Sequence, residues 1–188
     1  MTFWQIIAVA VFLAGPANAW VHGVAVTTFD PAHKIGINLT NGNLTATATS
    51  GGQVRSTNPV LDGRQVQVTF VLAIANGATA VGLVNALYTF AGGQLGVDDN
   101  SVGFYNNGDV VRNSIVLATI DPFIVGDTVT ISVNRTSLGS ISATFGDAGD
   151  PSASIDLSDW GTGPVYGAAQ VITTGDQWAS NWSNWPPP

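Results

Sequence analysis

The chain has 188 residues, which is enough for one ordinary domain with a substantial core. Only 9% of its residues are charged, and the net charge of −7 argues against a nucleic-acid surface, because phosphate contacts need clustered Lys and Arg. Cysteine is absent, which excludes disulfides, thiolate nucleophiles, Cys-ligated zinc and iron–sulfur sites.

The N-terminal segment differs from the rest of the sequence. An uncharged apolar run from Ile6 to Ala14 ends shortly before Ala17-Asn18-Ala19. Nine residues are too few to cross about 30 Å of hydrocarbon as a helix, but they suit a signal peptide, and Ala-x-Ala is the pattern that signal peptidase cleaves. We predict residues 1–19 as a signal peptide cleaved before Trp20, with no membrane span after its removal. The alternative is a retained hydrophobic segment that docks on a partner or a membrane.

Residues 20–175 consist of short runs in which apolar and polar residues alternate. Such runs predict half-buried strands; they cover residues 44–48, 65–70, 129–133 and 138–145. Turn dipeptides separate the runs at Asn41-Gly42, Gly51-Gly52, Asp62-Gly63, Asn76-Gly77, Gly92-Gly93, Asn107-Gly108 and Gly126-Asp127. Because these pairs suit tight hairpins, we expect consecutive antiparallel strands.

No segment has the periodicity of a long amphipathic helix, and the run 81–90 is rich enough in β-branched and aromatic residues to favour a strand. We therefore predict an all-β fold, an antiparallel two-sheet sandwich or jelly roll, as a single domain over residues 20–175. Val66, Val68 and Phe70, or else their alternating partners, should face the core together.

Three tryptophans lie close together in the C-terminal tail, residues 176–188. Their spacings of four and three place Trp178, Trp182 and Trp185 on one face of a short helix. That face either covers an open edge of the sandwich or forms an aromatic platform for a sugar or a protein. We favour the first interpretation, with at least two indoles mostly buried, because large apolar groups are normally buried where they can be.

Catalytic chemistry has few candidates in this sequence. The two histidines, His22 and His33, lie near the mature N-terminus, no Gly-x-Ser-x-Gly motif surrounds a serine, and Glu is absent. Asp98 and Asp99 form an adjacent carboxylate pair, but neighbours on a strand face opposite sides of the sheet and do not flank one glycosidic bond. We expect no enzymatic activity.

Calcium is the remaining cofactor candidate, since aspartates on loops offer the oxygen ligands that it prefers. The candidate ligands are Asp98, Asp99, Asn100, Asp147, Asp150, Asp156 and Asp159. Their spacing does not match an EF-hand, and Asp and Asn beside Gly are ordinary turn formers. We favour turn chemistry and predict no bound cofactor.

Several segments, read in order, resemble the SPRY-like domains of bacterial and phage proteins, relatives of the eukaryotic SPRY/B30.2 modules. The most distinctive is Gln94-Leu-Gly-Val-Asp-Asp-Asn-Ser-Val-Gly-Phe-Tyr105, which is similar to the family's "LG-x-D-x-NS-x-GY" stretch. The other matching segments are 29–31, 37–45, 53–57, 62–63, 114–119, 125–133 and 163–168. The resemblance covers about residues 26–170. It implies a sandwich of two antiparallel sheets whose loops bind other proteins and sometimes carbohydrate.

These observations together predict a non-enzymatic, exported SPRY-like binding or structural domain. It would mediate protein interaction at a cell surface, in the extracellular space or periplasm, or in a phage-like particle (virion). The alternative is a lectin-like carbohydrate-binding module that stacks sugars on exposed aromatic rings. The rings in question are Trp160, Tyr166, Trp178, Trp182 and Trp185.

Overall fold

The computed structural model describes residues 27–61, 63–90, 93–136, 140–147 and 152–185. The predicted signal peptide and Asp150 lie outside these ranges. The strands follow one another along a continuous antiparallel ladder in the order β10-β9-β8-β3-β12-β2-β11-β4-β5-β6-β7, and β1 pairs with β2.

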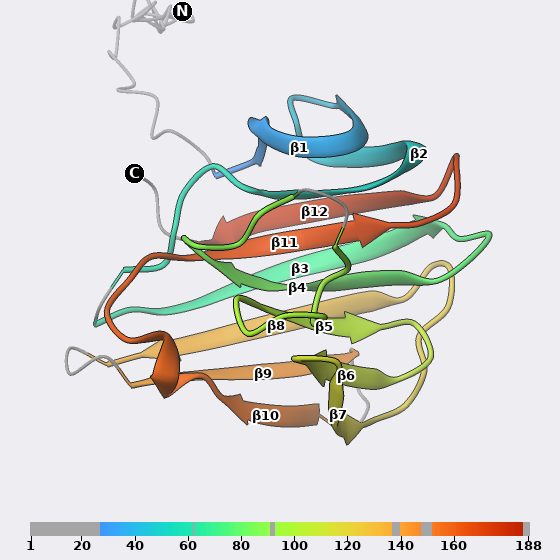
Figure 1. The fold of residues 1–188 in the computed structure, drawn as a ribbon. Helices are drawn as coiled ribbons and strands as arrows, with labels where there is room; N and C mark the ends of the chain where they lie inside the picture. The colour runs from blue at the N-terminus through green and yellow to red at the C-terminus, as the bar shows by residue number, and fades with distance from the viewer. Residues whose placement is uncertain (1–26, 62, 91–92, 137–139, 148–151, 186–188) are drawn as a thin grey trace, which may run out of the picture.

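In Figure 1 this ladder folds over at β2 into two layers. The front sheet contains β11, β4, β5, β6 and β7, and the back sheet contains β12, β3, β8, β9 and β10. The strands are β1 (Phe29–Thr40), β2 (Thr45–Ser56), β3 (Gln65–Ile74), β4 (Thr79–Asn85), β5 (Ser101–Tyr105), β6 (Asp109–Arg112), β7 (Ile115–Thr119), β8 (Thr128–Arg135), β9 (Ile141–Asp147), β10 (Ser152–Asp156), β11 (Val165–Val171) and β12 (Gln177–Asn184). The predicted antiparallel sandwich is confirmed.

Glycines form the corner where β1 and β2 pass from one sheet to the other. The first half of β2 pairs with β12, whereas Gly52 and the residues after it pair with β11. Gly36 and Gly51 adopt φ angles of +61° and +78°, which side chains on L-residues rarely allow. A Cβ on Gly52 would lie 1.8 Å from the carbonyl oxygen of Ile35. The bend therefore depends on residues without side chains.

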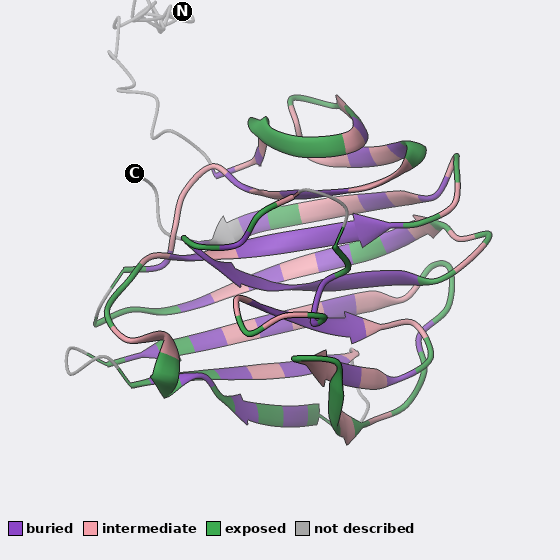
Figure 2. Ribbon diagram, viewed as in Figure 1, coloured by how far each residue is buried: buried purple, intermediate pink, exposed green. Residues whose placement is uncertain are grey.

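The core lies between the two sheets and follows the alternation of the strands (Figure 2). Val68 and Phe70 are fully buried, and Val66 is 6% exposed, so the predicted inward face of β3 is confirmed. The neighbouring strand β8 contributes Val129, Ile131 and Val133 to the same core. Among the described residues the helical structure is the single turn η1 (Ser158–Trp160), and none of it is long or apolar enough to cross a membrane.

The tryptophan-rich tail forms a strand, so the predicted short helix is wrong. Trp178 and Trp182 lie on β12, where a spacing of four also keeps two side chains on one face, because strand side chains alternate with a period of two. Nor does the tail cover an edge: β12 runs between β3 and β2 inside the ladder.

The prediction that these indoles are buried is confirmed. Trp178, Trp182 and Trp185 are exposed by 0%, 2% and 4%, and Trp182 packs edge-on against Phe29 and Phe70 with ring centroids 5.6 and 5.4 Å apart. Each indole N–H donates a hydrogen bond, to the Gln170 carbonyl, the Ser180 hydroxyl and the Asn58 carbonyl, respectively. The three rings belong to the core and offer no open face to a sugar, which corrects their assignment as stacking platforms.

Candidate interaction surface

Between β4 and β5, a connecting segment described over residues 86–90 and 93–97 lies on the outer face of the front sheet. Beneath it lies a second apolar cluster, separate from the main core, made of Ala80, Val84, Tyr88, Leu95 and Ala168. Gly103 on β5 makes room for this segment, since a Cβ there would lie 3.0 Å from the Cβ of Leu95. Tyr88 and Leu95 are therefore packed against the sheet.

Two glutamine side chains of the sheet form hydrogen bonds with the same segment. Gln53 on β2 accepts a hydrogen bond from the Tyr88 hydroxyl at 2.5 Å and donates to the carbonyl of Gly93. Gln170 on β11 accepts from the N–H of Leu95 at 2.5 Å. Burial, reinforced by the charge of Asp98, raises the pKa of Tyr88 above its ordinary range. The network ties Tyr88, Gly93 and Leu95 to the sheet.

A shallow pocket of about 230 Å³ lies where this segment meets the glycine corner. Ile35 and Ile172 line it together with Gly51, Gly52 and Gly93. The amide groups of the two glutamines at its base bond to each other at 3.2 Å.

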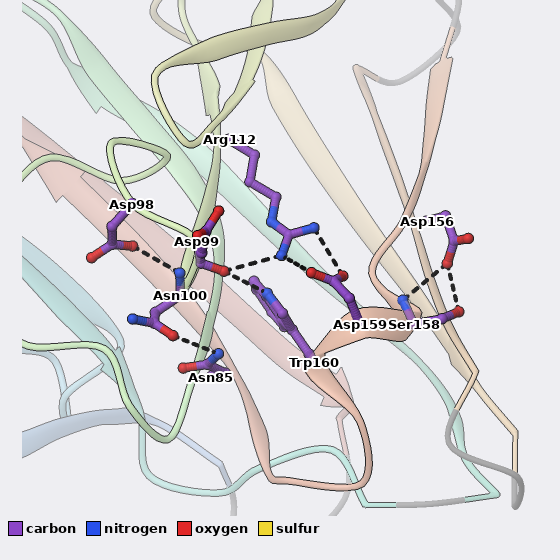
Figure 3. A network of polar contacts seen from close by, with 9 residues as sticks. All are labelled: Asn85, Asp98, Asp99, Asn100, Arg112, Asp156, Ser158, Asp159 and Trp160. Carbon is purple, nitrogen blue, oxygen red and sulfur yellow. Dashed lines mark hydrogen bonds and ion pairs between the residues drawn. The ribbon is translucent and has the colours of Figure 1, made fainter.

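A cluster around Arg112, which we call the Arg112 cluster, joins two loops at one end of the front sheet (Figure 3). The guanidinium of Arg112 on β6 binds both carboxylate oxygens of Asp159, with Nη1 to Oδ1 at 2.9 Å. Its Nη2 also donates to the carbonyl of Asp99 at 3.2 Å, and the Trp160 indole N–H donates to that carbonyl at 2.7 Å. The guanidinium carbon lies 5.5 Å from the centre of the Trp160 ring, within cation–π range.

The electrostatics of the Arg112 cluster follow from this geometry. The hydrogen bond from Arg112, together with its charge, lowers the pKa of Asp159. Hydrogen bonds from the hydroxyl and the N–H of Ser158 lower the pKa of Asp156. Both carboxylates are therefore anionic at neutral pH, and both face solvent.

Of the described aspartates singled out as calcium ligands, Asp98 and Asp156 accept hydrogen bonds within turns, whereas Asp159 binds Arg112. Asp98 Oδ1 accepts hydrogen bonds from the N–H of Asn100 at 3.0 Å and from the Ser101 hydroxyl at 2.8 Å. Asp99 bonds through its backbone carbonyl, and it lies in a turn rather than on a strand. Asp147 is the last residue of β9. Within the described ranges no group of three potential metal ligands comes together.

A second arginine–aromatic pair lies on the outer face of the front sheet. Arg55 on β2 is paired in register with Ala168 on β11, and its guanidinium carbon lies 3.9 Å from the centre of the Tyr166 ring. Both residues are partly exposed. Tyr166 also packs against the cluster beneath segment 86–97, as Phe90 does.

The structure thus places the candidate residues in three locations. Trp160 and Asp99 meet in the Arg112 cluster, Tyr166 lies on the outer face of β11, and the tail tryptophans lie in the core. Sequence reasoning missed Arg55 and Arg112, because their aromatic partners come from distant parts of the sequence. The only available signal was their rarity, since the protein has five Lys and Arg in total.

His33, a possible catalytic base, lies on the exposed part of β1. Its Nδ1 is 2.6 Å from a carboxylate oxygen of Asp30, three residues earlier on the same strand. This contact lies in the bulge of β1 between Phe29 and Lys34, whose register partners on β2 are Ser56 and Val54, the two residues that flank Arg55.

No protein-family model and no curated protein matches the sequence, but solved structures resemble its fold. The SPRY domain of human HERC1 superposes with a TM-score of 0.68 at 18% identity, covering 82% of this chain and 98% of that domain. A second human SPRY domain gives 0.62 at 16% identity, over 80% and 97% of the two chains. The TRIM65 PSpry domain gives 0.59 at 11% identity, over 83% and 92%. The protein therefore has the SPRY-like sandwich fold.

Proposed function

We propose that this protein is a non-enzymatic binding domain that holds a protein partner against the outer face of its front sheet and the adjoining Arg112 cluster. The observation that carries the proposal is the presence of two partly exposed arginine–aromatic pairs on this side of a rigid sandwich. Arginine and large aromatic residues dominate the energy of protein interfaces, because they combine apolar area with directed hydrogen bonds.

The connection between β4 and β5 suits this role. Leu87 at its start is 74% exposed, whereas Tyr88 and Leu95 anchor it to the sheet. A binding loop that is already fixed loses little conformational entropy when a partner binds. The solved SPRY domains share this fold, which is consistent with a binding surface carried on a sandwich of this kind.

The setting that we propose is outside the cytoplasm: secreted, periplasmic or at a cell surface, or else in a phage-like particle. The apolar segment Ile6–Ala14 and the following Ala-x-Ala pattern support export. Mass spectrometry of protein from its native source should find Trp20 as the N-terminal residue. Recovery of intact Met1 would contradict this part of the proposal.

A lectin-like role is the second candidate, and it rests on Trp160 and Tyr166 as the partly exposed rings. An arginine already lies over each ring, at 5.5 and 3.9 Å, which leaves less open surface for stacking on a sugar. A glycan array tests this candidate directly. Binding that depends on Trp160 would favour it over a protein partner.

Selection from a displayed library of random peptides tests the main proposal. We expect selected peptides to lose affinity for Leu87→Asp and Trp160→Ala. The matched control is Ile124→Asp, which introduces the same charge at a residue of similar exposure, 69%, in the loop after β7. A library that yields no binder, or binders that Ile124→Asp weakens equally, would refute the proposed surface.

A further inference from the structure

We infer that Arg55, stacked on Tyr166, is the anchor for a single carboxylate group of the partner. This inference rests on the proposed binding function and names the chemistry that the outer face recognises.

The environment of Arg55 supports this assignment. Its Nε is buried and has no hydrogen-bond acceptor, and no carboxylate among the described residues forms an ion pair with its guanidinium. The Nε of Arg112 is likewise buried without an acceptor, although Asp159 binds that guanidinium, so it is the missing ion pair rather than the Nε that leaves Arg55 open to a ligand. The partly exposed side chain leaves its guanidinium within reach of a ligand.

The Arg112 cluster contains a comparable arginine–aromatic pair. There too a guanidinium lies over an aromatic ring, but Asp159 of the protein itself binds both terminal nitrogens. A carboxylate fits the two parallel N–H donors of a guanidinium, which makes this the strong and specific form of the contact. Around Arg55 the ring is present, whereas the carboxylate must come from the partner.

The charge of the protein and the residues around Arg55 also limit the chemistry of the partner. The protein carries a net charge of −7, so a strongly acidic partner would be repelled at long range. Arg55 lies over Tyr166 and beside its register partner Ala168, and the bulge of β1 opposite it carries Asp30 and His33, whose side chains bond to each other. The partner segment that fits therefore carries one carboxylate and little further negative charge.

The carboxylate comes either from an Asp or Glu side chain or from the partner's own C-terminus, and the experiment separates the two. Peptides are selected on the wild-type protein from two libraries, one with free C-termini and one with amidated C-termini. We expect selected peptides to share one carboxylate, and replacing it by the amide should weaken binding about tenfold or more. Survival of the effect in the amidated library identifies a side chain as the source.

Variants of the protein then test Arg55 itself. Arg55→Gln should weaken the selected peptide by a similar factor, and in that variant the acid-to-amide change in the peptide should have little further effect. Arg55→Lys, which keeps the charge but loses the paired donors, should lie between the two. Arg64→Gln is the control, because it removes the same charge from an exposed residue outside this face and should leave affinity within twofold. Thermal unfolding verifies that each variant folds.

The possible failures are distinct. If neither library yields a binder, the proposed function fails. If peptides bind the outer face without a shared carboxylate, or if Arg55→Gln binds the carboxylate peptide as tightly as wild type, the function stands and this inference is wrong. Equal weakening by Arg64→Gln would show a general charge effect and would also overturn it.

Discussion

At the scale of single residues, the two arginine–aromatic pairs differ in how their charge is balanced. Arg112 is 13% exposed and bound by Asp159, which is itself 62% exposed, so this ion pair joins a partly buried strand to a solvent-facing turn. Arg55 has its ring contact but no such ion pair among the described residues. The first pair closes two loops of the protein, whereas the second remains open to a partner.

The lowered pKa of Asp159 makes the Arg112 contact pH-dependent. A carboxyl whose pKa is lower in the folded protein adds stability above its unfolded value, and this contribution is lost as the pH falls through the folded value. Asp159→Asn should therefore lower the free energy of unfolding by less than about 1 kcal/mol at pH 7, because the Asp159 carboxylate is largely exposed and screened by solvent. The difference in free energy of unfolding between this variant and wild type should shrink as the pH falls below 3.8, the ordinary pKa of an aspartate.

Urea denaturation at several pH values measures this difference. Asp121→Asn, at an exposed aspartate after β7, is the control and should show a smaller effect at pH 7. A difference for Asp159→Asn that grows on acidification would contradict the assigned sign.

At the scale of elements, β2 and β12 decide how the two sheets are joined. β2 contributes its first half to the back sheet and its second half to the front sheet, with the glycine corner between them. β12, the last strand in sequence, lies between β2 and β3 and completes the back sheet. The fold is therefore closed only when this last strand is in place.

We predict that one added methyl group at the glycine corner strongly lowers the free energy of unfolding. Gly52→Ala should lower the free energy of unfolding by about 2 kcal/mol or more, because its Cβ would lie 1.8 Å from a backbone oxygen that is itself held in the ladder. Gly93→Ala is the matched control: its Cβ meets nothing within 4 Å, and it should change stability by less than about 0.5 kcal/mol. Equal effects in guanidinium denaturation would show that the corner tolerates a side chain.

Because β12 lies between two other strands, we predict a severe effect when it is removed. Deleting residues 176–188 should abolish cooperative unfolding, since it uncovers the ladders of β2 and β3 and removes three buried indoles. Trp178→Ala alone should cost about 3 to 5 kcal/mol. Trp160→Ala, at a partly buried ring that packs against the margin of the core, is the control and should cost clearly less. A truncated protein that still melts cooperatively would contradict the central role of β12.

At the scale of the whole molecule, charge is sparse, and the twelve acids are all aspartates. Among the described ones, Asp98 accepts hydrogen bonds within a turn, Asp159 binds Arg112, and Asp30 on β1 pairs with His33. Side chains already used in this way would have to give up their hydrogen bonds to bind a metal ion.

This distribution predicts that divalent cations do not stabilise the fold. Calcium or EDTA should shift the melting temperature by less than about 1 °C, because a ligand raises stability only when it binds the folded state preferentially. Circular dichroism melts with each additive provide the measurement. A calcium-dependent shift of several degrees would overturn the assignment of these aspartates as turn formers.

The local signals in the sequence determined the strands and the fold class. Alternation in segment 65–70 placed Val66, Val68 and Phe70 together on one face, because a strand side chain's face depends only on its place in a period of two, and in the structure that face is the buried one. Dipeptides such as Asn41-Gly42 marked a turn for a similar local reason: Asn41 and Gly42 adopt φ angles of +53° and +63°. Ordered motifs such as the one from Gln94 to Tyr105 were enough to indicate the SPRY-like sandwich.

Only the tertiary structure decided which distant segments meet. The spacing of Trp178 and Trp182 suits one face of a helix and one face of a strand equally well, and pairing with β2 and β3 selected the strand. Arg55 reaches Tyr166, and Arg112 reaches Trp160, across long stretches of sequence that leave no local pattern. Strand partners and side-chain pairs depend on the packing of the whole molecule, so the surface proposed for binding appears only once the two sheets are folded together.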